Sequence, residues 1–276
     1  MIQFRKVDEV FDAIHETKVK ASDFRTNFFP VPAKLQNWIE RDELLGEVRN
    51  GVAFFFRKNL GFFRFYFCAG SLEKLQSEIS MLPILKAERV ATDLVGNETA
   101  VTEMLAPLEA VGFFRYAQLQ RLARPAQTGE PADSNLPVVF PEKTDAPAIF
   151  ELIENAFDRY GEQLPTLYEI EAAIESRQIF AVKHDGKITG LLFFETYGFN
   201  STVRFWAVAE KFRALKIGSA LMQHYFKTQN SVRRFTLWVN VQNENAIQKY
   251  KHYGYAPDGL IDCVLANKIA PHEINR

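Results

Sequence analysis

Residues 204–225 combine, in one continuous stretch, a strand pattern, a basic turn and the start of an amphipathic helix. The first six of them are rich in aromatic and β-branched side chains that alternate between two faces, which is typical of a strand. A turn with three cations follows, and apolar residues then recur four apart at Ile217, Leu221 and Tyr225, which predicts a helix. Because the first turn of a helix exposes unpaired N–H groups at the positive end of its dipole, this unit is suited to bind a phosphate.

A second pattern of the same kind comes one strand later. Residues 235–241 alternate, with Phe235, Leu237 and Val239 on one face, and predict a strand. Residues 245–255 then read as a short helix closed by Gly254, because glycine most easily takes the left-handed conformation that follows a helix. Two strand-to-helix units therefore follow one another in this half of the chain.

Together, the two segments resemble the GNAT acetyltransferases. Arg213 and Gly218 fall into register with that family's Arg/Gln-x-x-Gly-x-Gly/Ala loop, which wraps the pyrophosphate of acetyl-CoA, and Lys216 stands where the family usually has its first glycine. Lysine keeps the backbone N–H and adds a charge, so only the flexibility and the close backbone approach of glycine are lost. Residues 245–255 resemble the family's Asn…Tyr…Gly-Phe/Tyr segment, and the resemblance covers residues 138–276.

The resemblance implies roles for particular residues. Backbone groups of Trp206 and Val208 would hold the pantetheine and the thioester where two strands splay apart, and Asn245 would contact acetyl-CoA from the other side. Tyr250 matches the tyrosine that protonates the leaving sulfur, since a phenol stays protonated at neutral pH. Glu195, near the end of the preceding strand, is the candidate general base. The pyrophosphate would bind the backbone N–H groups and charges of Arg213, Ala214, Leu215, Lys216, Ile217, Gly218 and Ser219.

Each catalytic assignment has a structural alternative. Tyr250 follows Ile247 by three residues and could be a core ring with an exposed hydroxyl, while Glu195 could be a solvated carboxylate at a strand end. An acceptor amine that arrives already neutral would need no base at all. By the same resemblance residues 157–161 are expected to face the acceptor, against the alternative of an ordinary surface loop.

The first 124 residues are rich in phenylalanine. Residues 54–56 and 62–67 read as paired strands around a turn at 59–61. The surrounding periodicity gives the element order of the GNAT fold, but no Arg-x-x-Gly-x-Gly occurs here, so we expect a degenerate copy that holds no acetyl-CoA. A role for these aromatic strands in stacking RNA bases is disfavoured, because the pattern matches poorly and the half lacks a basic excess.

Residues 125–137 are polar and contain several prolines, which predicts a linker. The expected fold is α+β (mixed α/β), with two GNAT-like domains, each a mixed, mostly antiparallel sheet flanked by helices. Residues 1–124 would form the degenerate domain, with a substrate-shaping or interaction role, and residues 138–276 the catalytic domain that binds acyl-CoA. Within the latter we expect strands at 138–140, 179–183 and 188–196 and helices at 147–157 and 167–177.

Composition bears mainly on partners and compartment. The 33 basic and 34 acidic residues nearly balance, so the overall charge gives no reason to expect nucleic acid as a partner. The two cysteines, Cys68 and Cys263, form no metal-ligand spacing, and no apolar run approaches the ~18 residues of a membrane span. We therefore expect a cytoplasmic protein without a metal, a nucleic-acid partner or a membrane partner, and a homodimer is left open.

The resemblance implies transfer of an acetyl group from acetyl-CoA to a primary amine, on a small molecule or a peptide, in a direct ternary complex. A CoA-binding sensor without turnover is the alternative, because Lys216 replaces a glycine and residues 204–208 contain no acid. A third interpretation, an aminoacyl transferase resembling the peptidoglycan-bridge enzymes, is disfavoured by the pyrophosphate loop.

Overall fold

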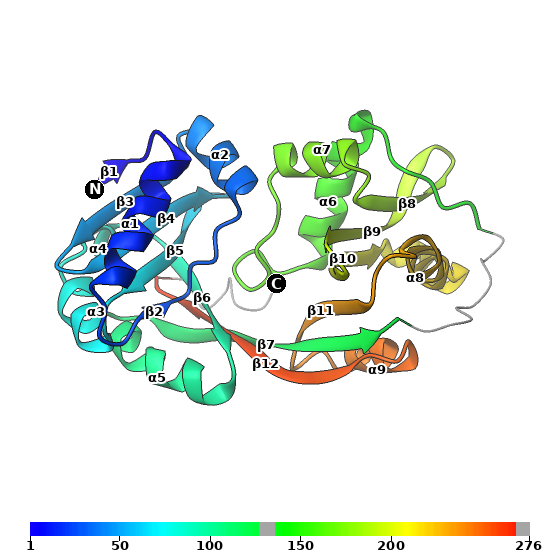
Figure 1. The fold of residues 1–276 in the computed structure, drawn as a ribbon. Helices are drawn as coiled ribbons and strands as arrows, with labels where there is room; N and C mark the ends of the chain where they lie inside the picture. The colour runs from blue at the N-terminus through cyan, green and yellow to red at the C-terminus, as the bar shows by residue number, and fades with distance from the viewer. Residues whose placement is uncertain (127–135, 269–276) are drawn as a thin grey trace. The chain divides into compact units, whose positions relative to one another are not determined.

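The computed structural model describes residues 1–126 and 136–268 and divides the chain into two compact units (Figure 1). Unit 1 comprises Met1–Gln118 and Leu260–Arg276, and unit 2 comprises Leu119–Gly259. Most of the linker expected at residues 125–137 falls outside the described residues. Within the part of the chain that the structure describes, no helix has the length and apolar character needed to cross a membrane.

Unit 1 is built on a sheet covered on both faces. Its strands lie in the order β1 (Ile2–Gln3), β3 (Leu44–Arg49), β4 (Val52–Asn59), β5 (Phe62–Ala69) and β6 (Val90–Gly96), and β2 (Arg25–Thr26) pairs with β5. Neighbours pair antiparallel except β5 and β6, which are parallel. The helices are α1 (Val7–Val19), α2 (Pro32–Glu40), α3 (Leu72–Ile79), α4 (Pro83–Ala87) and α5 (Glu98–Glu109).

The phenylalanine run of β4 is buried because helices cover both faces of this sheet. Phe54 and Phe56 point into a cluster formed with α3, α4 and α5, whereas Phe55 points into a second cluster formed with α1 and α2. Phe65 of β5 stacks against both Phe54 and Phe56, with ring centroids 6.0 and 4.9 Å apart. A strand buried on both faces reads as a continuous apolar run, which accounts for the composition of this segment.

Unit 2 is a second mixed sheet. Its strands lie in the order β7 (Phe114–Pro125), β11 (Arg234–Asn240), β10 (Asn200–Val208), β9 (Lys187–Tyr197) and β8 (Ile179–His184), and only β10 and β11 pair in parallel. The strand expected at residues 138–140 is a single bridge between Val139 and Ala181. The helical segments are η1 (Lys143–Asp145), α6 (Ala146–Ala156), α7 (Leu167–Glu175), η2 (Glu210–Leu215), α8 (Ile217–Thr228) and α9 (Glu244–His252).

Each unit contains one strand segment contributed by the other half of the sequence. β7 begins in unit 1, and its residues 119–125 pair antiparallel with β11 in unit 2. β12 (Ala256–Ala266) begins in unit 2, and its residues 261–266 pair antiparallel with β6 in unit 1. The compact units therefore begin and end elsewhere than the domains expected at residues 1–124 and 138–276. The mixed, mostly antiparallel sheets with flanking helices confirm the expected fold class.

Candidate active site

The strands β10 and β11 separate toward their C-terminal ends. Among the described residues their ladder covers only four pairs and ends at Val203 and Leu237, although β10 continues to Val208 and β11 to Asn240. The pairing of β10 with β9 shifts register between Val203 and Phe205. Such a bulge bends a strand and increases its twist, which is consistent with β10 leaving its parallel neighbour at this point. Backbone groups at the ends of both strands consequently face an opening in the sheet.

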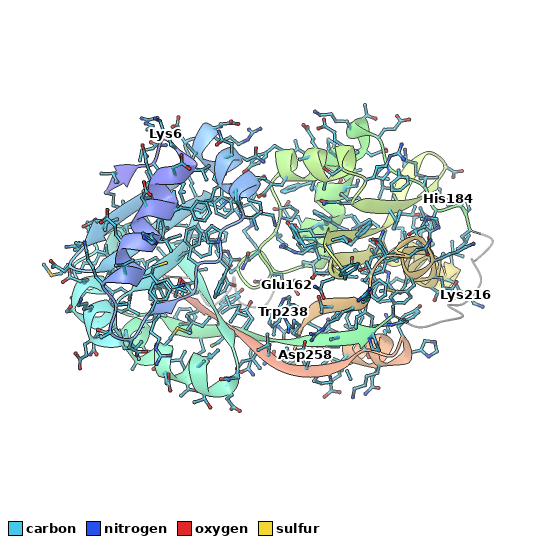
Figure 2. The ribbon with its side chains drawn as sticks, viewed as in Figure 1. Lys6, Glu162, His184, Lys216, Trp238 and Asp258 are labelled. Carbon is cyan, nitrogen blue, oxygen red and sulfur yellow. The ribbon has the colours of Figure 1, made fainter. Side chains whose placement is uncertain are left out.

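A cavity of about 750 Å³ occupies this opening. Its walls come from β10, β11, the start of α8, α9 and the loop that joins α6 to α7. Figure 2 shows Glu162 and Lys216, both of which line it, well separated within unit 2. The lining residues are Ala156, Phe157, Glu162, Trp206, Ala207, Val208, Arg213, Lys216, Gly218, Ser219, Trp238, Val239, Asn240, Asn243, Asn245, Ala246, Gln248, Lys249, Tyr250, His252 and Tyr253.

The cavity reaches both faces of the sheet. Trp206 packs with the apolar cluster of α8 and α9, and its ring centroid lies 5.6 Å from that of Tyr250. Successive side chains of a strand point to opposite faces, and Phe205 accordingly contacts Phe157 beyond the other face, with centroids 5.0 Å apart. Trp238 lies between Leu237 and Val239, which belong to the α8 cluster, so its side chain points to the Phe157 face.

The turn before α8 has the conformation that glycine favours. Lys216 is the N-cap residue of α8 and adopts φ 58° and ψ 18°, in the left-handed region. A glycine takes this conformation without steric cost, whereas lysine takes it at a cost of about 1–2 kcal/mol. Gly218 and Ser219 belong to the first turn of α8, and both line the cavity. The unpaired N–H groups of this turn therefore lie beside the cavity.

The structure places the expected binding residues in three environments. Trp206, Val208, Arg213, Lys216, Gly218, Ser219, Asn245 and Tyr250 all line the cavity. Ala214 and Leu215 are exposed in η2 and do not line it, and Ile217 is buried in the core beneath α8. Any part that these last three residues play in binding would therefore come from the backbone alone.

The expected general base Glu195 lies outside the cavity. Its carboxylate is largely buried and pairs with Arg204, with Nη1 and Oε2 3.5 Å apart. The register shift that follows Val203 places Arg204 at the bulge, a feature that the sequence did not reveal. We therefore do not assign proton abstraction to Glu195.

Tyr250 combines the two alternatives considered for it. Its ring is buried, with 8% of its surface exposed, and packs against Trp206 and Tyr255, yet the residue lines the cavity. Burial, and secondarily the negative charge of Glu162, raise the pKa of its phenol. Within the described ranges no group hydrogen-bonds to its hydroxyl. Tyr250 therefore stays protonated at neutral pH, with its donor available to a ligand in the cavity.

Glu162 lines the cavity but was not among the residues singled out from the sequence. It is the only carboxylate among the described cavity-lining residues, and it directly follows the loop at 157–161 that was expected to face the acceptor. Burial raises its pKa to about 7; a backbone hydrogen bond from Asp158 opposes this shift, and the charge of Asp158 adds to it. Three cations line the cavity: Arg213 in η2, Lys216 at the start of α8, and Lys249 in α9.

In residues 1–126 and 136–268 no group of three His, Cys, Asp or Glu side chains could hold a metal ion.

Comparisons with known proteins identify the region around this cavity. Residues 146–255 match the model of the acetyltransferase (GNAT) family. No curated protein matches the chain by sequence. Because this match includes both strands of the opening, α8 and α9, it covers most of the cavity walls.

Several solved structures share the fold at low sequence identity. A tandem GNAT protein from the clavulanic acid biosynthesis pathway is 13% identical, with a TM-score of 0.59, and the alignment covers 96% of this chain and 95% of that one. A Drosophila protein is 12% identical, with a TM-score of 0.61 and coverage of 94% and 96%. A GCN5-related N-acetyltransferase from Sphaerobacter thermophilus is 16% identical, with a TM-score of 0.56 and coverage of 80% and 77%. The chain thus has a tandem GNAT-like fold, and its residues 146–255 match the model of the GNAT acetyltransferase family.

Proposed function

We propose that unit 2 is an N-acetyltransferase that moves an acetyl group from acetyl-CoA to a primary amine of a small molecule or peptide in a ternary complex. The observation that carries this proposal is the cavity at the β10–β11 opening. It joins a cationic helix start, at Arg213 and Lys216, to a buried tyrosine and a carboxyl group. These are the groups that an anionic thioester and an amine require.

The residues at the helix start fit the diphosphate of acetyl-CoA. N–H groups of the first turn of α8 would donate to the phosphate oxygens, while Arg213 and Lys216 supply positive charge. Where β10 and β11 separate, their backbone groups lack a ladder partner from the facing strand. The N–H groups there would donate hydrogen bonds to the pantetheine amides, and the carbonyl oxygens would accept hydrogen bonds from them. Asn245 would contact the same ligand from α9.

Tyr250 would act at the leaving sulfur. Acetyl-CoA supplies the thioester, and the Tyr250 hydroxyl would donate its hydrogen to the sulfur as the thiolate develops. The raised pKa favours this role because it disfavours the phenolate and keeps the donor in place. The acceptor would enter from the Phe157 face, where the ring of Trp238 also lines the cavity.

For unit 1 we propose an interaction or substrate-shaping role without acetyl-CoA. The segment between β5 and α3, residues 70–71, contains none of the cations that surround the start of α8. We also place the protein in the cytoplasm, a proposal supported by the two free, buried cysteines, Cys68 and Cys263.

A calorimetric titration with acetyl-CoA tests the cofactor site. Arg213→Glu is expected to lower the affinity by about tenfold to a hundredfold, since hydrogen bonds to a charged group contribute roughly 1.5–3 kcal/mol. Lys211→Glu makes a charge reversal in the same exposed η2 but outside the cavity, and should bind acetyl-CoA like the wild type. Equal affinity in all three proteins would contradict this placement.

Release of CoA in the presence of a panel of primary amines tests the activity. We expect turnover by the wild type and a large loss in Tyr250→Phe, which keeps the ring but removes the donor. Binding of acetyl-CoA without turnover by any amine would instead support the alternative, a CoA-binding sensor.

A further inference from the structure

The geometry points to Glu162 as the general base of the transfer, which takes the proton of the acceptor amine on the opposite side of the sheet from Tyr250. This inference rests on the proposed function and assigns a step to a residue outside the two motifs. Three observations carry it: the place of the carboxyl group in the cavity, the turn that fixes it, and the position of Tyr250.

Glu162 stands apart from the other carboxylates near the site. Among the described residues that line the cavity it is the only acid. Glu195 is paired with Arg204, and Glu154, at the end of α6, forms an ion pair with Arg159. No cation in the described ranges pairs with Glu162, whose side chain accepts one hydrogen bond, from the N–H of Asp158 to Oε2 at 3.0 Å. The remaining acceptor capacity of the carboxylate is therefore available to an amine.

A compact turn holds this carboxyl group in place. The Asp158 side chain accepts hydrogen bonds through Oδ1 from the N–H groups of Tyr160, at 3.0 Å, and Gly161, at 2.6 Å. Tyr160 and Leu164, on either side of Glu162, are buried with 7% and 1% of their surfaces exposed. A base must be positioned before it can act, and these anchors fix the backbone from which Glu162 reaches the cavity.

The charges around Glu162 suit a base that works near neutral pH. The titratable groups that face it are Asp158, in its own turn, and Tyr250, from α9. Burial and the charge of Asp158 outweigh the backbone hydrogen bond and raise the pKa of Glu162 to about 7. A general base is most effective when its pKa lies close to the working pH, because it is then both available and strong enough.

Glu162 and Tyr250 approach the opening from opposite faces. Glu162 and Phe157 belong to the α6–α7 loop, on the face of the sheet to which Phe205 points, whereas Tyr250 belongs to the cluster of α8 and α9 on the other face. An amine that attacks from one side of a thioester carbon needs a base on that side, and the departing sulfur needs a donor elsewhere. The positions of Glu162 and Tyr250 in the cavity fit this requirement.

The Glu162 carboxylate takes one proton from the acceptor ammonium and later passes it to water. The neutral nitrogen bonds to the thioester carbon, and the carbon–sulfur bond breaks with its electron pair on sulfur. The sulfur takes the proton of the Tyr250 hydroxyl, and the second proton lost by the nitrogen replaces it on the tyrosine. The products are an amide, CoA and one released proton.

Two amines of similar shape separate this role from a structural one. Benzylamine is protonated at neutral pH and needs a base, whereas O-benzylhydroxylamine is already neutral there and does not. We expect Glu162→Gln to lower CoA release with benzylamine by about 10²–10⁴-fold, the usual contribution of a general base, and to leave the rate with O-benzylhydroxylamine close to that of the wild type. With benzylamine, the rise of the wild-type rate around pH 7 should be lost in the variant.

The matched control is Glu154→Gln, the same chemical change in an exposed ion pair outside the cavity, which should leave both rates unchanged. Calorimetry with acetyl-CoA shows whether the cofactor site is intact in each protein. Equal losses with the two amines, or no loss with either, would overturn the role of Glu162 while leaving the transferase proposal in place. Binding of acetyl-CoA by the wild type without release of CoA by either amine would count against both proposals, and absence of binding would remove the proposed function itself.

Discussion

The indole of Trp206 lies against Gly218, and its Nε1 donates a hydrogen bond to the Gly218 carbonyl oxygen at 3.2 Å. A Cβ atom built on Gly218 would stand 3.1 Å from Cζ2 of this ring, closer than ordinary van der Waals contact. A small residue is therefore required at Gly218, the last position of the loop, because Trp206 from β10 fills the space beside it. The close approach of a phosphate would be a second reason for a small residue there.

Gly218→Ala should push the Trp206 ring into the cavity. We expect a loss of stability of about 1–3 kcal/mol, the usual cost of overpacking, together with weaker binding of acetyl-CoA. Thermal unfolding and calorimetry measure the two effects. Gly96→Ala is the control, because its added Cβ would meet only ordinary contacts near Ala100 in unit 1. Unchanged binding in Gly218→Ala would show that Trp206 does not shape the site.

Lys216 allows its backbone and its charge to be tested separately. Lys216→Gly and Lys216→Ala both remove the ammonium group, so both should weaken acetyl-CoA binding to a similar extent. Only glycine relieves the left-handed conformation, and we expect the glycine variant to be more stable than the alanine variant by about 1 kcal/mol. Chemical denaturation measures this difference, and an alanine variant of equal or higher stability would mean that the turn changes its path.

Glu162→Gln should change the pH dependence of stability. The pKa of Glu162 is raised in the folded state to about 7 from 4.5, so the associated stability is fully present below pH 4.5 and is lost as the pH rises through 7. Glutamine has no such proton. Between pH 5 and pH 8 the free energy of unfolding of the variant should therefore rise, relative to that of the wild type, by on the order of 1–3 kcal/mol. This size follows because one pKa unit corresponds to about 1.4 kcal/mol. Melting curves across this range that run parallel would contradict the buried position of the carboxyl group.

The side chain of Asn267, directly after β12, forms hydrogen bonds to two backbone groups of unit 1. Its Oδ1 accepts from the N–H of Val90 at 2.7 Å, and its Nδ2 donates to the carbonyl of Leu85 at 2.9 Å. Asn267→Ala leaves both buried backbone groups without this partner and should cost about 1–3 kcal/mol for each. Lys268→Ala, one residue further on and exposed, is the comparison. Hydrogen exchange at β6 should rise in the first variant alone.

The sequence predicted the parts of the site that local patterns determine. The strand–turn–helix at residues 204–225 and the helix that carries Tyr250 depend on periodicity and on a glycine signal, and the structure shows both. The GNAT region and the α+β class were likewise predicted correctly.

The residues that the sequence did not predict depend on tertiary contacts. Glu162 has no motif of its own, and only the packing of the α6–α7 loop against the strand opening brings it into the cavity. Glu195 was a reasonable candidate by position along its strand, but the bulge at Arg204 gives it a partner instead. β3 was also missed, since its Gly46 weakens the strand pattern, although the ring of Phe4 occupies the space where a side chain would stand.

The contribution of β12 to unit 1 constrains how the protein can be made. A ribosome completes residues 1–118 long before it reaches residue 261. The edge of β6 in the nascent N-terminal half therefore stays unpaired until its partner strand, β12, has been synthesised. Separate expression of the two halves, cut at residues 127–135, would leave each fragment without a strand segment of its sheet. The two halves of such a split protein should become soluble only when they are produced together.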